Sequence, residues 1–196
     1  AEYHIEAWTG MGVVKNAVDI FPESSAPMLG TYPVNSREIL LTFNTSDLNR
    51  SVATDEKSRW RFHQWTPDLV LVMLGCNDYL SWPTPTETEF VDGYVKLLHS
   101  LFASYNVTPA TSATKAPVII NLCGGHSGNN RAPCKNIEAA VMDMRRAGFN
   151  RCFYVEIAPD WLDYPKDFGC LDHRNVEGQA KLAAHLLPKI KEFVGW

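Results

Sequence analysis

The 196-residue sequence has no long hydrophobic run and no cluster of basic residues. A membrane-spanning helix needs about 20 consecutive apolar residues, and no segment of the sequence approaches that length. Lys and Arg number 18 against 22 Asp and Glu, so the formal net charge is -4 at pH 7. Proteins that bind nucleic acid usually present a basic face. We therefore expect neither a membrane span nor a nucleic-acid partner.

Internal repeats, low-complexity tracts and domain linkers are also absent from the sequence. With 45% hydrophobic and 20% charged residues, a chain of this length can bury a sizeable core. We expect a single α/β domain over residues 1–196. The first residues have neither the charged start nor the apolar centre of a signal peptide, so we expect any signal peptide to have been removed or to lie upstream of Ala1.

Cysteine is scarce, and its count of five is odd. Cys123 and Cys134 flank a Gly-rich loop that a disulfide could close, whereas Cys152 lies in a predicted strand and is expected to be buried. The odd count leaves room for a bridge to a further segment. The alternative is a cytosolic protein with reduced thiols. A single Cys and a single His, at 123 and 126, fall short of a zinc site, so we expect no metal.

Three Asn-x-Ser/Thr sequons lie in polar stretches, at Asn44, Asn49 and Asn106. Such sequons are glycosylation acceptors when a protein is secreted. Together with the candidate disulfide they favour a secreted glycoprotein, with a cytoplasmic location as the alternative.

Apolar runs alternate with helical patterns, which predicts a parallel sheet. The run over 69–74 has no polar face, which is typical of a strand covered on both sides. The stretch over 21–59 is loop-like. We predict strands over residues 3–8, 68–75, 117–122 and 151–157.

Three helices have recognisable ends. A capping box formed by Thr84 and Glu87, with Pro85 at the first helical position, predicts a helix that continues to about residue 101. A second helix is predicted over 133–147, ended by Gly148. Asn175 is the predicted N-cap of the last helix.

The strand over 68–75 ends in a Gly-x-Asn-Asp turn. In open parallel sheets ligands bind at the carboxyl ends of strands. Gly75 permits close backbone approach there, and the side-chain N–H of Asn77 could stabilise an oxyanion. From the local sequence alone, Asn77 would more often cap the turn through its own side chain. Asp78 is expected to organise the turn rather than to take part in chemistry.

A lone histidine, His173, lies in the loop before the last helix. A loop His on a rigid scaffold is a candidate general base. The alternative is a surface His near a helix start, where the helix dipole disfavours the imidazolium ion. A neutral imidazole in that place also suits a base.

Three blocks, in order, resemble those of the SGNH (GDSL-type) hydrolases, and most closely the carbohydrate esterase family two deacetylases. They are Thr-Gly-x-Gly over 9–12, Gly-x-Asn-Asp over 75–78 and Gly-Cys-x-x-His over 169–173, and the resemblance runs over nearly the whole chain. It implies a three-layer α/β/α flavodoxin-like fold with a parallel sheet. It also implies that Asn77 and Gly10 form an oxyanion hole, that His173 is the base, and that no cofactor is needed.

The sequence departs from this family at two places. No Gly-Asp-Ser block occurs, so we expect the first strand and the Ser nucleophile to be absent from this chain and supplied by an upstream segment or an N-terminal companion chain. The Asp that usually precedes His by three residues is Cys170, and the Pro that usually follows is Arg174. Asp172 is the remaining candidate for orienting His173, although its adjacency strains that contact. Some family members use a Ser–His dyad in which a backbone carbonyl steers the His.

The resemblance implies a serine-type esterase that removes acyl groups, most simply O-acetyl groups, from carbohydrate. Trp82, beside the Asn77 turn, is the candidate for stacking on a pyranose, although aromatic residues more often belong to the core. One alternative is a catalytically silent SGNH-fold glycoprotein with a binding or structural role. A lipid or thioester hydrolase, recognisable by a long apolar groove, is the second alternative.

Overall fold

The computed structural model describes residues 2–3, 5, 12–15, 17, 62–80, 82–124 and 132–196. The chain divides into two compact units. The first unit spans Ala1–Thr66 and Leu74–Val107, and the second spans Pro67–Met73 and Thr108–Trp196. The expectation of one domain over 1–196 stays a prediction.

The second unit is built on a parallel sheet. Three strands pair in the order β1-β2-β3, with Leu69 beside Val118 and Ile119 beside Cys152. The predicted parallel α/β arrangement is therefore confirmed. The strands are β1 (Leu69–Val72), β2 (Val118–Gly124) and β3 (Cys152–Ile157).

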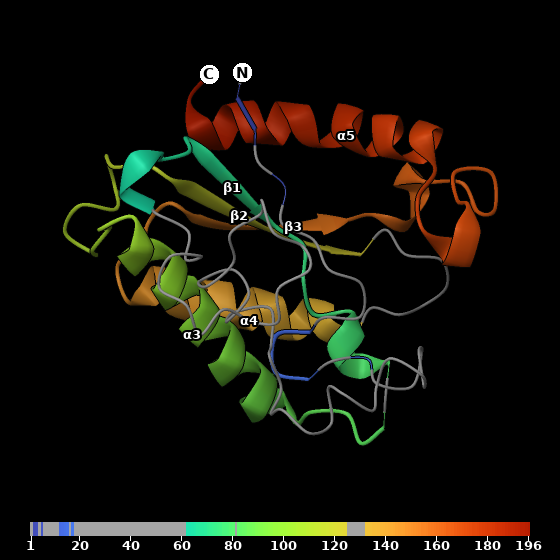
Figure 1. The fold of residues 1–196 in the computed structure, drawn as a ribbon, viewed down its shortest axis with the longest axis horizontal. Coiled ribbons are helices and arrows are strands. Elements are labelled where there is room, and N and C mark those ends of the chain that lie inside the picture. The colour runs from blue at the N-terminus through green and yellow to red at the C-terminus, as the bar shows by residue number, and fades with distance from the viewer. Residues whose placement is uncertain are drawn as a thin grey trace. The chain divides into compact units, whose positions relative to one another are not determined.

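Helices cover both faces of this sheet (Figure 1). Side chains alternate between the faces along a strand. On one face, Val118, Ile120 and Leu122 belong to the same buried cluster as two leucines of α5 (Val176–Val194). The other face contacts α4 (Ala132–Arg146). The second unit thus has three layers, helix, sheet and helix.

Strand β1 is shorter and less buried than the sequence predicts. Only four residues of the predicted span 68–75 pair as a strand, and Leu71 is 47% exposed. The expectation of cover on both faces is wrong at Leu71, because β1 lies at an edge of the sheet that the described residues form. An apolar run looks the same in a central strand and in an edge strand.

The predicted strand over 3–8 can be compared with the structure at two positions. Tyr3 and Ile5 do not lie in a strand, and their side chains are 84% and 72% exposed. At these residues the prediction is wrong, because an alternating pattern does not by itself supply a neighbouring strand to pair with. The other residues of that span, and the stretch 21–59, lie outside the described part of the chain.

The first unit contains helix α3 (Glu87–Ser104). Its N-cap is Thr86, whose side-chain oxygen accepts the Glu89 N–H at 3.2 Å, while the Glu89 carboxylate accepts the Thr86 N–H at 2.8 Å. The predicted capping box of Thr84 and Glu87 is therefore wrong by two residues. The Thr-x-x-Glu pattern occurs in both registers, so the local sequence cannot choose between them.

Helix α3 ends at Ser104, three residues later than predicted, whereas the caps predicted at Gly148 and Asn175 are confirmed. Gly148, with φ of +96°, donates its N–H to Arg145 O just beyond α4, and the Asn175 side chain accepts the Gly178 N–H at the start of α5. In the described part of the chain, no helix is long and apolar enough to cross a membrane. Short 3₁₀ helices occur at η3 (Phe62–Gln64), η4 (Asn77–Tyr79), η5 (Pro159–Trp161) and η6 (Cys170–Asp172).

Candidate functional site

The Gly-x-Asn-Asp turn belongs to the first unit. Gly75 has φ of +112°, a conformation that favours glycine, and the chain then enters the 3₁₀ helix η4 with Asn77 as its first residue. Asn77 is half-buried, and its backbone oxygen accepts the Leu80 N–H at 3.4 Å. A tight turn thus follows the strand at the position that the sequence predicts.

The carboxylate of Asp78 is buried and holds a second segment of the first unit. Its Oδ2 accepts the Val13 N–H at 2.8 Å, and its Oδ1 accepts the N–H groups of Val14 at 2.7 Å and Lys15 at 2.9 Å. Successive backbone N–H groups that converge in this way form an anion-binding nest. Burial raises the pKa of the Asp78 carboxyl, and the three N–H groups oppose that shift.

Gly12 is required beside this nest. A Cβ added there would lie 1.8 Å from Lys15 O and 2.7 Å from Asp78 Oδ2, so any side chain would displace the segment. Asp78 therefore connects residues 12–15 to the Asn77 turn by hydrogen bonds. This agrees with the expectation that Asp78 organises the turn.

Trp82 is on the surface, where 88% of its area is exposed. The alternative that Trp82 belongs to the core is therefore wrong. Next to it, Lys15 Nζ donates to Pro83 O at 2.6 Å, which ties this segment to the one that Asp78 holds. The first unit thus presents an exposed indole five residues after Asn77 in the sequence.

His173 belongs to the second unit, between η6 and α5. Its side chain is exposed, and ring Nδ1 lies 3.3 Å from Cys170 O. The His173 N–H also donates to Cys170 O, at 3.1 Å. When Nδ1 carries the ring proton, it donates to that carbonyl and Nε2 keeps a free lone pair.

Asp172 contacts a different partner. Its Oδ1 accepts the hydroxyl of Tyr164 at 3.2 Å, so the group that adjoins Nδ1 of His173 is a backbone carbonyl and not this carboxylate. Leu171 and Asp172 have φ of 51° and 57°. Non-glycine residues in the left-handed region cost on the order of 1–3 kcal/mol each and persist where the surroundings hold them.

An ion-pair cluster beside this loop was missed by sequence reasoning. Lys181 of α5 lies 2.7 Å from the buried carboxylate of Asp167 and 2.8 Å from the exposed carboxylate of Asp163. Hydrogen bonding to Lys181 lowers the pKa of Asp167, and Asp163 raises the pKa of Lys181. Lys181 and Asp167 are 14 residues apart, so no local pattern indicates the pair.

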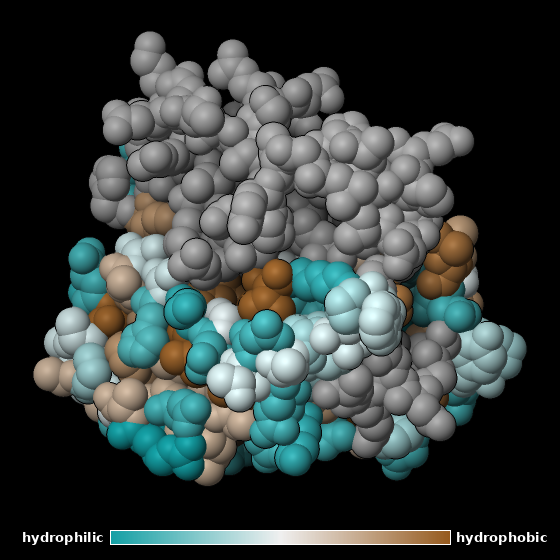
Figure 2. Space-filling view, turned by 90° about the horizontal axis from the view of Figure 1, so that it is seen from below, coloured by the Kyte–Doolittle hydropathy of each residue, from teal (hydrophilic) through white to brown (hydrophobic). Residues whose placement is uncertain are grey.

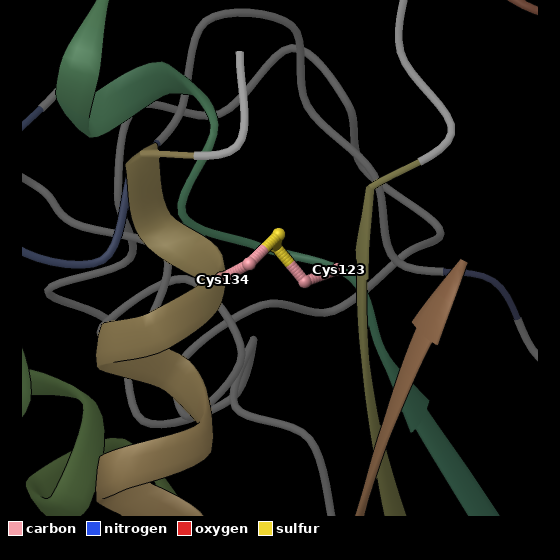
Figure 3. The surroundings of a disulfide bond; sticks show 2 residues. All are labelled: Cys123 and Cys134. Carbon is pink, nitrogen blue, oxygen red and sulfur yellow. A yellow bond between two sulfur atoms is a disulfide. The ribbon is translucent and has the colours of Figure 1, made fainter. Parts of the chain in front are cut away.

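The predictions for Cys123, Cys134 and Cys152 are confirmed. Cys123, at the end of β2, forms a disulfide with Cys134 of α4 (Figure 3). Cys152 is buried, and burial raises its thiol pKa to about 12. Among the described residues, no group of His, Cys, Asp and Glu could hold a metal ion.

The remaining candidates divide between the two units or lie outside the description. Asn77 and Trp82 belong to the first unit, and His173 and Asp172 to the second. Gly10, Asn44 and Asn49 lie outside the described residues, whereas Asn106 is described and exposed. That Asn77, His173 and Gly10 share one pocket stays a prediction.

Where its residues are described, the face in Figure 2 mixes hydrophilic side chains with scattered hydrophobic ones. Scattered apolar residues are ordinary on protein surfaces.

Solved structures with the same fold are carbohydrate esterases. The chain matches a family two carbohydrate esterase from Clostridium thermocellum, in complex with cellohexaose, with a TM-score of 0.65 and 22% identity over 95% of this chain and 48% of that one. It matches an acetyl xylan esterase from the rumen bacterium Butyrivibrio proteoclasticus with a TM-score of 0.68 and 16% identity, over 95% and 50%.

A third match is a carbohydrate esterase whose active site displays divergent catalytic and non-catalytic binding functions, with a TM-score of 0.56 and 18% identity over 93% of this chain and 48% of that one. The chain spans about half the length of these structures. No protein-family model matches the sequence, and no curated protein matches it. The class that the comparisons define is thus the α/β fold of carbohydrate esterases.

Proposed function

We propose that this protein is a serine-type ester hydrolase that removes acyl groups, in particular O-acetyl groups, from carbohydrate. The observation that carries the proposal is the contact of His173 Nδ1 with Cys170 O, at 3.3 Å, in a chain with the fold of carbohydrate esterases. A carbonyl acceptor keeps the proton on Nδ1, and Nε2 is then the basic atom. The Ser nucleophile comes from an upstream segment or a companion chain.

In this mechanism Nε2 of His173 accepts the proton of the Ser hydroxyl as its oxygen bonds to the acyl carbon. The carbonyl oxygen becomes an oxyanion, which the side-chain N–H of Asn77 and the backbone N–H of Gly10 stabilise. The imidazolium then gives its proton to the leaving sugar oxygen as the ester bond breaks. Water hydrolyses the acyl-enzyme by the same steps, with His173 again as base and then acid.

Carbohydrate as the substrate is supported by Trp82. An indole that is 88% exposed offers an apolar face on which a pyranose can stack. One structural neighbour is a carbohydrate esterase in complex with cellohexaose.

Secretion is supported by the Cys123–Cys134 disulfide and by the exposed sequon at Asn106. Disulfides persist in oxidising compartments and are rare in the cytosol. Mass spectrometry of the native protein would test this, because a cytoplasmic protein would have both thiols reduced and Asn106 unmodified.

The experiment that tests catalysis uses the intact protein that contains this chain and an aryl acetate. His173→Ala should abolish hydrolysis, and Asn77→Ala should lower kcat about a hundredfold. His185→Ala is the matched control, because His185 lies exposed in α5 and stacks on Trp161 at 4.7 Å. Full activity of His173→Ala would reject the mechanism.

The second candidate is a non-catalytic carbohydrate-binding protein. A neighbour whose active site has divergent catalytic and non-catalytic binding functions favours it. In that case the wild-type protein would hydrolyse no aryl acetate but would bind cello-oligosaccharide, and Trp82→Ala would weaken the binding.

A further inference from the structure

The loop that carries His173 is joined to α5 by the Lys181 clamp, which we define as Lys181, Asp163 and Asp167. Lys181 Nζ lies 2.8 Å from Asp163 Oδ2 and 2.7 Å from Asp167 Oδ2. The Asp167 side chain is fully buried, whereas Lys181 and Asp163 are 36% and 68% exposed. A buried carboxylate needs a charge partner, and removing the partner leaves an uncompensated charge. Lys181 therefore determines where Asp167 can lie.

Asp167 in turn fixes the start of the loop. Its Oδ2 accepts the Asp163 N–H at 2.7 Å, and its backbone oxygen accepts the Asn175 N–H at 3.0 Å. A Cβ at Gly178 would lie 2.2 Å from that backbone oxygen, so glycine lets α5 approach this closely. The loop thus packs against the first turn of α5 at Asp167 before it enters that helix at Val176.

The two ends of the loop also pair with each other. Phe168 and Arg174 form an antiparallel bridge, and the Gly169 N–H donates to His173 O at 2.7 Å. Leu171 and Asp172, in left-handed conformations, lie between them. Such a conformation relaxes unless its surroundings hold it. Among the described residues, the Lys181 clamp provides a charged contact between this closed loop and α5.

We propose that the Lys181 clamp positions His173, so that ring Nδ1 faces Cys170 O and Nε2 remains free. This inference rests on the role proposed for His173 as the base. Lys181 contacts no reacting atom in this scheme and is a positioning residue. Without the clamp the loop relaxes, the Nδ1 contact is lost for part of the time, and both ring tautomers become populated.

The test compares Lys181→Met, Lys181→Arg and a control in the intact protein. Asp143→Asn is the control, because Asp143 pairs with Arg146 on the exposed side of α4. One readout is the ring ¹⁵N shifts of His173, which report the tautomer without any activity. The other is kcat and KM for an aryl acetate.

Wild type and Asp143→Asn should show the Nδ1-protonated tautomer, and Lys181→Met should show a mixture. We expect kcat of Lys181→Met to fall about tenfold with KM little changed, since a misplaced base affects the chemical step. Lys181→Arg keeps the charge and should recover most of kcat. If Lys181→Met does not fold, Asp163→Asn removes only the exposed contact of the clamp and should give a smaller shift in the same direction.

Wild-type tautomer and kcat in both Lys181→Met and Asp163→Asn would overturn the proposal. An Nε2-protonated His173 in the wild type would also overturn it. A tautomer that responds to Lys181→Met in a protein without hydrolase activity would support the clamp and reject the proposed function.

Discussion

The Asp78 nest allows a prediction that needs no substrate. In Asp78→Ala, the N–H groups of Val13, Val14 and Lys15 lose the acceptor that they share. A buried donor left without a partner costs about 1–3 kcal/mol. Of the three donors only that of Val13 is fully buried, so roughly 3–9 kcal/mol is an upper limit. Burial raises the pKa of Asp78, so removing the carboxylate also removes a desolvation cost. We therefore expect a loss of about 3 kcal/mol, at the lower end of that range.

The assay is amide hydrogen exchange of the intact protein. A loss of about 3 kcal/mol corresponds to exchange roughly a hundredfold faster at Val14 and Lys15. Ser112→Ala is the matched control, because the Ser112 hydroxyl donates to Gly148 O at 2.7 Å and accepts the Asn150 N–H at 3.1 Å in the second unit. It should leave the amides of Val14 and Lys15 at wild-type rates.

Wild-type exchange at both amides in Asp78→Ala would refute this reasoning. It would mean that other groups, or water, satisfy these donors as well as the carboxylate does. Faster exchange in Ser112→Ala as well would show that the effect is global and not local to the nest.

Three further predictions concern the second unit. Replacing both Cys123 and Cys134 with Ala should lower the free energy of unfolding by about 3 kcal/mol, because the disulfide closes a short loop in the unfolded chain. Gly178→Ala should lower the urea midpoint, because the new Cβ would overlap Asp167 O. Hydrogen bonding to Lys181 lowers the pKa of Asp167 in the folded protein. The ionised carboxylate therefore contributes to the free energy of unfolding at pH values above the pKa of an Asp in the unfolded chain. This contribution is lost as the pH falls through the lowered pKa of the folded state. Asp167→Asn should remove that acidic loss in a pH series of urea unfolding.

Each of these predictions has a contrary result. Equal stability of the disulfide-free variant and the oxidised wild type would contradict the loop-closure estimate. An unchanged urea midpoint in Gly178→Ala would show that α5 can move away from the loop. If Asp167→Asn keeps the wild-type loss of stability in acid, other carboxylates are responsible for it.

Local signals in the sequence predicted the parts of the fold that depend on near neighbours. Gly148 and Asn175 mark helix ends because a left-handed glycine and a side-chain cap act within a few residues. Cys123 and Cys134 were paired correctly because only a short loop separates them.

Contacts between distant residues could not be predicted in this way. The bonds from Asp78 to residues 13–15 join positions more than sixty residues apart, and the Lys181 clamp joins a loop to a helix. The exposure of Leu71 likewise depends on which strand lies next to β1. The capping box was predicted at the wrong position for a different reason. The Thr-x-x-Glu pattern occurs twice there, from Thr84 and from Thr86, and the local sequence does not distinguish the two.

The unequal surroundings of the three cysteines outside the disulfide have a practical use. Cys152 is buried with a thiol pKa of about 12, and Cys76 is half-buried with a pKa raised by burial, whereas Cys170 is exposed. Alkylating reagents attack the thiolate, so at neutral pH they should label Cys170 first. A nitroxide or fluorophore attached there would sit three residues from His173 and report the motion of that loop directly, without any mutation of the chain.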